Sequence, residues 1–392
     1  MKSNMLYLQY SNCVAVRGFL RSALYDLQTN RFKFITNELQ SILSKSVTVE
    51  YHSSRHIHTE DINVLIKEKY GQLIDIKMEC LFIKMDLSWR SASQITNCIL
   101  ICNGDFSFPE TLFTQVNELL CKDIQVNGLN CSTIDEIDSL LKSTIDFNSI
   151  QLLINYFGDE NYMENLFEKY AILDSLFVFK SPFEKIDINK EHKIFYTKKT
   201  HSYFDVQKIN KDYFTSNRPF YTESQLHNTY FNRKLCIDYN GYIRNSPELE
   251  WHYGHISEVK LEDAIKDKGT DKFFFKKYAE YKKAYTDGTK FNLNFDQCKP
   301  AFDALFLIHK ELIDVCKACE FRHMCVDACI PLQRNDGTWY RSKECNYNPY
   351  ICKWEGEEGY QSLDECGVIC DETGFSIDEE KIAKINEALW TE

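Results

Sequence analysis

The residues of this chain best suited to chemistry are cysteines near its C-terminal end. Four of them, Cys316, Cys319, Cys325 and Cys329, lie within the string CKACEFRHMCVDAC, and Cys345 follows. Several thiolates can bind one metal centre tightly, and close spacing along the chain lowers the entropic cost of assembling them. Such ligands hold either zinc or an iron–sulfur cluster, and spacing alone does not distinguish the two. The sequence therefore predicts a metal centre built by this string.

The N-terminal sequence indicates the cellular compartment of the protein. Residues 1–10 have neither a basic start nor a long apolar stretch, so they do not form a secretory signal. No run approaches the ~18 apolar residues of a membrane-spanning helix. We therefore expect a cytoplasmic protein whose 16 cysteines are thiols and not disulfides.

The charge excludes some partners. The formal net charge is −12, and acidic residues concentrate in the C-terminal tail. A nucleic-acid binder would show a basic footprint, and an anionic membrane would repel an acidic surface. The sequence thus predicts neither nucleic acid nor membrane as a partner.

Length and pattern predict an α/β protein of three regions, 1–76, 77–234 and 235–392. In the first, strands are expected at 6–10, 16–26 and 31–35, followed by helices at 37–43 and 59–70, the second capped by Thr59. This pattern suggests a small winged-helix-like unit.

The second region alternates strands and helices, which favours parallel β–α units in a sheet or partial barrel. Strands are expected at 95–102, 124–129, 150–156, 175–180 and 193–196, and helices at 111–120, 133–143 and 162–170. The third region ends in an expected helix at 377–390 with Ser376 and Glu379 as a capping box. That helix either packs on its own chain or docks a partner.

The cysteine spacing C-x2-C-x5-C-x3-C with a later cysteine resembles the SPASM domain of radical-SAM peptide-modifying enzymes, which binds auxiliary [4Fe–4S] clusters. The resemblance implies that Cys316, Cys319, Cys325 and Cys345 hold one cluster. It also implies that Cys329 joins upstream cysteines on a second cluster, for which the candidate is Cys236.

The upstream segment CIDYNGYIRNSPELEWHYGHI departs from the family because no cysteine follows Cys236 in it. The candidates to complete a second site are His252, His255, Cys352, Cys366 and Cys370. The histidines have the simpler alternative of a surface or packing role.

The radical-SAM triad C-x3-C-x2-C is missing. Its only near match is Cys98-x3-Cys102, where Asp105 occupies the third position, and both cysteines lie in the apolar run ITNCILIC. We therefore expect them to be buried small hydrophobes, and no functional S-adenosylmethionine cluster.

Stretches along nearly the whole chain are similar to SPASM-domain peptide maturases of the grasp-with-spasm (graspetide-type) systems, which are degenerate radical-SAM/SPASM proteins. These stretches are SNCVAVRGFLRSALYDLQTNRFKFI, SWRSASQITNCILI, CKACEFRHMCVDAC and ECNYNPYICKWE. The resemblance implies a maturation factor for a ribosomally synthesised, post-translationally modified peptide (RiPP), with a precursor peptide and an ATP-grasp ligase as partners. The alternatives are an iron–sulfur enzyme that acts on the precursor directly and a zinc-stabilised structural scaffold.

Residues 1–76 also look like a PqqD-like peptide-recognition domain, in which a leader peptide adds a strand to an exposed sheet edge and packs on a helix. The matching elements are the strand expected at 31–35 and the helix expected at 59–70. Backbone hydrogen bonds would supply affinity and side-chain pockets specificity. The alternative is a structural cap without a ligand, because exposed edges are normally protected.

Overall fold

The structure is a computed structural model that describes most of the chain. The described residues are 5–45, 48–51, 58–103, 108–131, 133–142, 147–189, 193–201, 209, 211, 214–247, 249, 252–266, 307–341 and 343–390. They form two compact units: a cysteine unit made of Met1–Arg90, Gln207–Tyr230 and Leu307–Glu392, and a sheet unit made of Ser91–Val206 and Phe231–Phe306. Each unit thus combines segments from more than one of the three predicted regions.

The sheet unit is built on eight strands in the order β11-β12-β10-β9-β8-β7-β13-β14. All neighbours pair in parallel except the two edge strands β11 and β14. The strands are β7 (Asn97–Asn103), β8 (Asp123–Asn130), β9 (Ser149–Asn155), β10 (Leu173–Phe179), β11 (Lys185–Ile188), β12 (Lys193–Tyr196), β13 (Lys234–Ile237) and β14 (Ile243–Arg244). The predicted α/β class is confirmed at this level.

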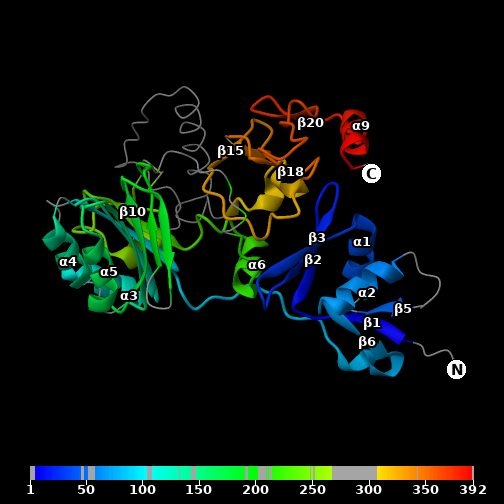
Figure 1. The fold of residues 1–392 in the computed structure, drawn as a ribbon, viewed down its shortest axis with the longest axis horizontal. Helices are drawn as coiled ribbons and strands as arrows, with labels where there is room; N and C mark the ends of the chain where they lie inside the picture. Colours follow the sequence, from blue (N-terminus) through cyan, green and yellow to red (C-terminus); the bar gives the residue numbers. More distant parts are fainter. Residues whose placement is uncertain are drawn as a thin grey trace. The chain divides into compact units, whose positions relative to one another are not determined.

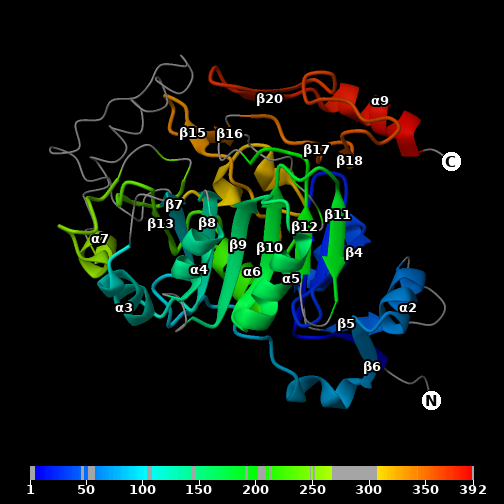
Figure 2. The same cartoon turned by 60° about the vertical axis from the view of Figure 1, so that its left-hand side comes forward.

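The helices of the sheet unit follow its strands in turn: α3 (Glu110–Glu118), α4 (Ile134–Lys142), α5 (Glu160–Lys169) and, after β14, α7 (Leu261–Lys266). From β7 to β10 each new strand is added on the same side of the last, so right-handed crossovers place α3, α4 and α5 on one face (Figures 1 and 2). Gly128 of β8 allows this packing, since a Cβ there would meet Ile137 of α4 at 2.8 Å. The opposite face of the sheet is therefore free of these helices.

The N-terminal part of the cysteine unit has two three-stranded antiparallel sheets, β5-β1-β6 and β2-β3-β4. Its elements are β1 (Met5–Gln9), β2 (Cys13–Arg17), β3 (Ser22–Asp26), β4 (Arg31–Ile35), α1 (Asn37–Lys45), β5 (Thr48–Tyr51), α2 (Thr59–Lys67), β6 (Gly71–Asp75) and a 3-10 turn η1 (Ile76–Leu81). The strand expected at 16–26 is wrong, because the chain turns at Gly18–Arg21 and runs as the hairpin β2–β3.

The C-terminal part of the cysteine unit consists of short elements between loops. They are α6 (Arg218–Ser224), η5 (Lys310–Leu312), η6 (Cys316–Ala318), β15 (Pro331–Gln333), β16 (Trp339–Arg341), β17 (Tyr347–Asn348), β18 (Lys353–Trp354), β19 (Val368–Cys370), β20 (Phe375–Ile377) and α9 (Glu379–Trp390). Each pair of consecutive strands here forms a two-stranded antiparallel ribbon. Loops of this kind place cysteines near one another without a large sheet.

Both predicted helix caps differ in the structure. The residue before α2 is His58, and no side chain caps that helix, so Thr59 is its first residue and not its cap. Ser376 lies in β20, and α9 is capped instead by Asp378, whose carboxylate accepts the Lys381 N–H at 3.0 Å. Ile382 of α9 is buried with Val315 and Tyr350, so α9 packs on its own unit.

The central strand β3 of the β2-β3-β4 sheet is buried on both faces. One face, with Leu24, joins a core that includes α1 and α2. The other face, with Ala23 and Tyr25, packs against Phe321 and Met324 of the cysteine string. The N-terminal sheet and the cysteine string therefore share one core. Among the described residues, no helix has the length and apolar character needed to cross a lipid bilayer.

Candidate functional site

Two features of the cysteine unit bear on function: the thiols of the string 316–345 and a groove beside β4. Leu20 and Arg21, in the turn between β2 and β3, line the groove, and Arg21 also donates to Glu320 of the string. The string holds this turn in place through Glu320.

The four cysteines expected to hold one cluster lie in one neighbourhood. Burial is the largest influence on the pKa of each thiol, and it raises all four; that of Cys325 rises to about 12. Negative charge on the Cys345 sulfur raises the pKa of Cys316, Cys319 and Cys325 further. Cys345 therefore lies close enough to act on all three thiols. In the described part of the chain, no three His, Cys, Asp or Glu side chains are arranged to hold a metal ion.

Buried cations face these thiols. Lys310 is 6% exposed, and the negative charges of Cys325, Asp327 and Cys316 raise its pKa although burial alone would lower it. The guanidinium of Arg341 is held by Asp327 through Nε–Oδ2 at 2.9 Å and Nη2–Oδ1 at 3.1 Å. A four-thiolate centre carries net negative charge, so nearby buried cations suit such an occupant.

The Asp327–Arg341 pair also fixes the backbone of the string. Asp327 Oδ1 accepts the N–H of Cys329 at 3.0 Å, and Arg341 Nη1 donates to the carbonyl of Lys343 at 2.8 Å. These contacts tie the segment of Cys325 to the segment of Cys345. The protein itself thereby holds together the two segments that carry candidate ligands.

Backbone conformation near Cys316 and Cys319 is specialised. Val315, directly before Cys316, has φ = 67°, which a β-branched residue adopts only when its surroundings enforce it. The Phe321 N–H points at the Cys319 sulfur at 3.4 Å. Hydrogen bonds to cysteine sulfurs are one means by which proteins adjust the potential of iron–sulfur centres.

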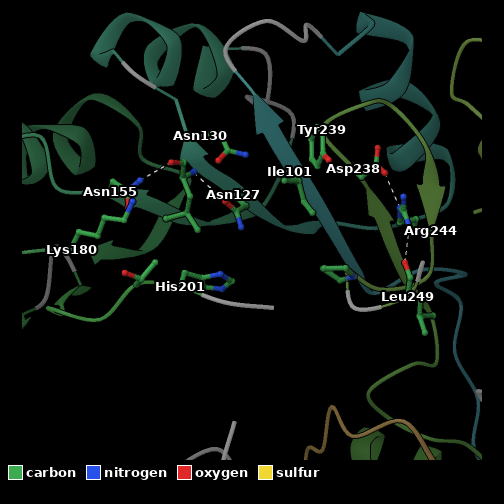
Figure 3. Close-up of a pocket in the computed structure, with 13 residues that line it drawn as sticks. Ile101, Asn127, Asn130, Asn155, Lys180, His201, Asp238, Tyr239, Arg244 and Leu249 are labelled. Carbon is green, nitrogen blue, oxygen red and sulfur yellow. Dashed lines mark hydrogen bonds and ion pairs between the residues drawn. The ribbon is translucent and has the colours of Figure 1, made fainter. Parts of the chain in front are cut away.

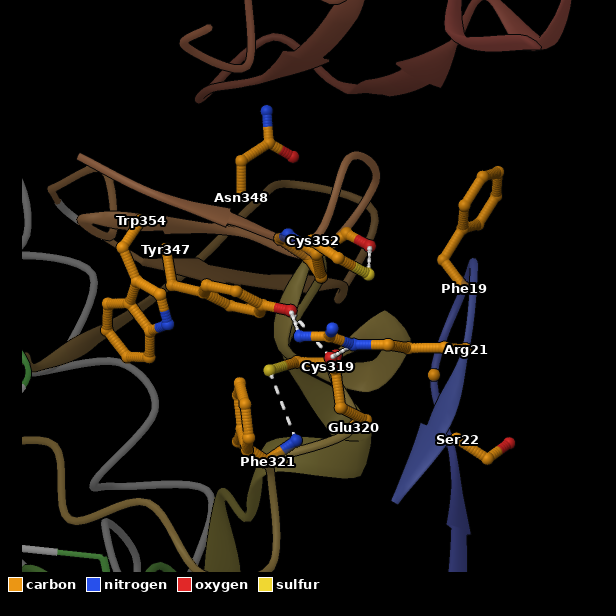
Figure 4. Close-up of polar contacts among 12 residues, drawn as sticks. Phe19, Arg21, Ser22, Cys319, Glu320, Phe321, Tyr347, Asn348, Cys352 and Trp354 are labelled. Carbon is orange, nitrogen blue, oxygen red and sulfur yellow. Dashed lines mark hydrogen bonds and ion pairs between the residues drawn. The ribbon is translucent and has the colours of Figure 1, made fainter. Parts of the chain in front are cut away.

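Arg21 links the N-terminal sheet to the string (Figure 4). Its Nε donates to Glu320 Oε1 at 2.8 Å, and Tyr347 donates to the same oxygen at 2.6 Å. Glu320, which stands between Cys319 and Phe321 in the sequence, is fully buried. The phenol of Tyr25 donates to the Glu320 carbonyl at 2.5 Å. Sequence reasoning missed this network, because nothing local indicates that Arg21 and Glu320 meet.

The remaining candidate cysteines lie elsewhere. Cys329 is buried near Cys345, whose pKa it raises. Cys236 belongs to β13 of the sheet unit and is buried there with Ile99 and Ile101, so its predicted partnership with Cys329 stays a prediction. Cys366 packs in the core beside α9.

Four further residues predicted to complete a second site have local partners. His255 contacts Ser257 Oγ at 2.7 Å and the Asn240 carbonyl at 2.8 Å. His252 accepts the Gly254 N–H at 3.2 Å. In the cysteine unit, the sulfur of Cys370 accepts from Arg334 at 3.6 Å, and Cys352 is buried with its thiol toward the Pro349 carbonyl. Local contacts thus account for each of these positions.

The near match to the radical-SAM triad is structural. Cys98 and Cys102 lie in β7 and are buried, and burial raises the pKa of both thiols. The prediction that these two cysteines are buried is confirmed, and a buried thiol with a raised pKa has little thiolate to react.

The groove beside β4 has a cavity volume of about 530 Å³. Its walls are β4 and α2, and its floor is made by Ile35, Leu39 and Leu65, which are buried. Exposed apolar side chains, Phe34 and Val64, stand along it at 40% and 39% exposure. Of the described strands only β3 pairs with β4, so no described strand occupies the outer edge of β4. At the start of β4 the Ser216 hydroxyl donates to the Arg31 carbonyl at 3.3 Å.

No family model, no curated protein and no solved structure matches the chain.

Proposed function

We propose that this protein is a cytoplasmic maturation factor for a ribosomally synthesised peptide. It binds the precursor's leader in the groove beside β4, holds a [4Fe–4S] cluster on Cys316, Cys319, Cys325 and Cys345, and acts with an ATP-grasp ligase. In this proposal residues 1–76 serve as a winged-helix-like recognition domain, the sheet unit is a degenerate radical-SAM-like partial barrel, and the cysteine string is a SPASM module.

The observation that carries the proposal is that no described strand occupies the outer edge of β4 next to α2. An extended peptide can complete the backbone hydrogen bonds of such an edge while its alternate side chains enter the groove. Phe34 and Val64 offer apolar contact, and Lys33, Glu38 and Asp61 supply charges of both signs at the rim. The groove therefore fits a mixed-charge peptide with apolar residues at alternate positions.

The chemistry of the string supports the cluster. Four thiols, buried cations and an N–H directed at the Cys319 sulfur are the groups that a [4Fe–4S] cluster needs around it. When bound, such a cluster supplies electron transfer or structural stabilisation. The residues of this chain supply ligands, charge balance and a backbone held by Asp327 and Arg341.

Calorimetry with the leader segment of the precursor tests the groove. We expect binding by the wild-type protein and a loss of about tenfold or more in Phe34→Asp, because the variant places a carboxylate where apolar surface is buried. Leu120→Asp, which changes an exposed leucine in the sheet unit, is the matched control. No binding by the wild type, or equal binding by Phe34→Asp, would remove the leader from the proposal.

Metal analysis of protein purified without oxygen tests the cluster separately. About four irons and four sulfides per chain are expected, falling in Cys345→Ser and unchanged in Cys80→Ser, whose thiol is exposed in η1. Zinc without iron would replace the cluster with a structural zinc site and leave the peptide-binding proposal standing.

A further inference from the structure

The sheet unit contains a pocket of about 560 Å³ at the carboxyl ends of its parallel strands (Figure 3). Asn127 and Asn130 of β8, Asn155 at the end of β9 and Lys180 directly after β10 line it. In open parallel sheets, ligands bind outside the carboxyl ends of the strands, because loops there can supply polar groups without disturbing the core. This pocket has no part in the proposed function of the cysteine unit.

Asn127 marks the pocket as a binding site. Its neighbours Val126 and Gly128 point to the face that carries the helices, so Asn127 points to the opposite face. It is 1% exposed, and its Oδ1 accepts the Leu129 N–H at 3.1 Å. Its Nδ2 has no hydrogen-bond partner among the residues that the structure describes. A buried donor left unpaired costs free energy, so an acceptor brought by a ligand would be bound favourably here.

The carboxylate in the pocket is already neutralised. Asp238 accepts from Arg244 Nε at 2.8 Å and from the N–H groups of Asn240 and Tyr242 at 2.9 and 3.0 Å. Arg244 also donates to the Leu249 carbonyl at 2.7 Å. This pair therefore forms a fixed wall and leaves little charge for a ligand.

Lys180 supplies the excess charge. Its side chain is exposed and forms no ion pair with any residue that the structure describes. Its backbone has φ = 54°, and its N–H donates to the Lys199 carbonyl at 3.0 Å, which fixes where the side chain starts. Figure 3 shows Lys180, Asn127, Asn155 and His201 around a common space. Burial lowers the pKa of His201, which leaves Lys180 as the positive group.

We propose that this pocket binds a carboxylate group, with Asn127 Nδ2 and Lys180 Nζ donating to it, carried either by a small molecule or by an acidic side chain of a peptide. A cation that pairs with no described carboxylate, together with amide donors, matches a singly charged planar anion. A phosphate group would call for more positive charge or for the first-turn amides of a helix, and none of the described residues that line the pocket is helical. Ile101, Pro247 and Leu249 offer apolar surface for the rest of the ligand.

Titration calorimetry of the full-length protein with two probes tests the proposal and separates the two sources. Butyrate represents a small carboxylate, and an acetylated and amidated pentapeptide with one central glutamate represents an acidic side chain. We expect at least one probe to bind, and Lys180→Gln and Asn127→Asp each to weaken it by about tenfold or more. Lys193→Gln is the matched control, because Lys193 begins β12 at the opposite end of the sheet and pairs with Asp174.

The outcomes are distinct. Binding of butyrate alone assigns a small molecule, and binding of the peptide alone assigns an acidic segment. If neither probe binds at concentrations up to about 10 mM, any affinity is too weak to be useful and the proposal is overturned. Binding that Lys180→Gln leaves unchanged would overturn it as well. If Asn127→Asp fails to fold, Lys180→Gln still decides, since it alters only an exposed side chain.

Discussion

At the scale of single residues, the contact of greatest consequence is the one between Arg21 and Glu320. The Glu320 side chain has no exposed surface, and its Oε1 accepts hydrogen bonds from Arg21 and Tyr347. Its Oε2 has no hydrogen-bond partner among the described residues. A buried carboxylate that loses its cation is strongly unfavourable. Arg21→Gln is therefore expected to lower the free energy of unfolding by about 3 kcal/mol in urea denaturation.

Two further variants make this prediction specific. Arg90→Gln removes an exposed pair with Asp86 and should change the free energy of unfolding by about 0.5 kcal/mol or less. Adding Glu320→Gln to Arg21→Gln should restore part of the loss, because the unpaired charge is then gone. An Arg21→Gln protein as stable as the wild type would show that the contact does not hold the cysteine string.

Asp26 gives a prediction about pH. Burial would raise the pKa of its carboxyl, but hydrogen bonds from the side chains of Thr29 and Arg31 and from two backbone N–H groups lower it below the usual 3.8. The folded state therefore binds this proton less readily than the unfolded chain. The stabilisation is present above pH 3.8 and is lost as the pH falls through the lower, folded pKa.

Asp26→Asn should accordingly lower the free energy of unfolding by about 2 kcal/mol at pH 7, and by less at pH 3. Urea unfolding of wild type and variant at the two pH values measures this gap. A gap of equal size at both would mean that ionisation of Asp26 contributes nothing.

The charge of Cys345 acts on the thiols of Cys316, Cys319 and Cys325, and that the four hold a metal centre stays a prediction. Sequence reasoning at this scale could indicate the cysteines themselves, because their spacing along the chain is close. It could not find Lys310, Arg341 or Asp327 as partners of these thiols, because a charged residue in a polar loop has no pattern that distinguishes a buried pair from a solvated one.

At the scale of elements, the hairpin β2–β3 depends on Gly18. A Cβ at Gly18 would lie 2.4 Å from the Arg21 carbonyl oxygen and 3.0 Å from both the Cβ and the backbone nitrogen of Glu320. Gly18→Ala must therefore displace either the turn or the string, and about 2 kcal/mol or more of stability should be lost.

Gly374→Ala is the control for this prediction. No atom lies within 4 Å of a Cβ built at Gly374, and its backbone is not in the left-handed region. It should unfold at nearly the wild-type urea concentration. If both variants behave alike, the close approach of the hairpin to Glu320 is not a constraint.

Periodicity predicted most helices and parallel strands of the sheet unit to within a few residues, since each is a single amphipathic or apolar run. It failed at the hairpin, where Gly18 interrupts one long apolar stretch whose two halves both favour strand. The predicted helix caps were also wrong. Thr59 and Ser376 are residue types that often cap helices, but His58 directly precedes α2 and Asp378 caps α9.

At the scale of the whole molecule, the cysteine unit joins the two ends of the chain, and no local pattern could have predicted this. One face of the β2-β3-β4 sheet is closed by Phe321, Met324 and Tyr347, nearly 300 residues away along the chain. A peptide seated at β4 would thus lie on the sheet that supports the cysteine string. Leader recognition and the metal centre, if both proposals hold, belong to one compact unit.

The shared core predicts how residues 1–90 pack and unfold when they are expressed alone. Without the string, the face formed by Val16, Ala23 and Tyr25 meets water, and the Tyr25 phenol loses its acceptor at Glu320. An exposed apolar face on a small sheet favours loose packing and association. The fragment should bind a hydrophobic dye and unfold without a sharp transition, whereas the full-length protein should bind little dye and unfold cooperatively. A fragment that unfolds cooperatively and binds no dye would show that the N-terminal sheet is an independent domain, in which case the string would be only an attachment to it.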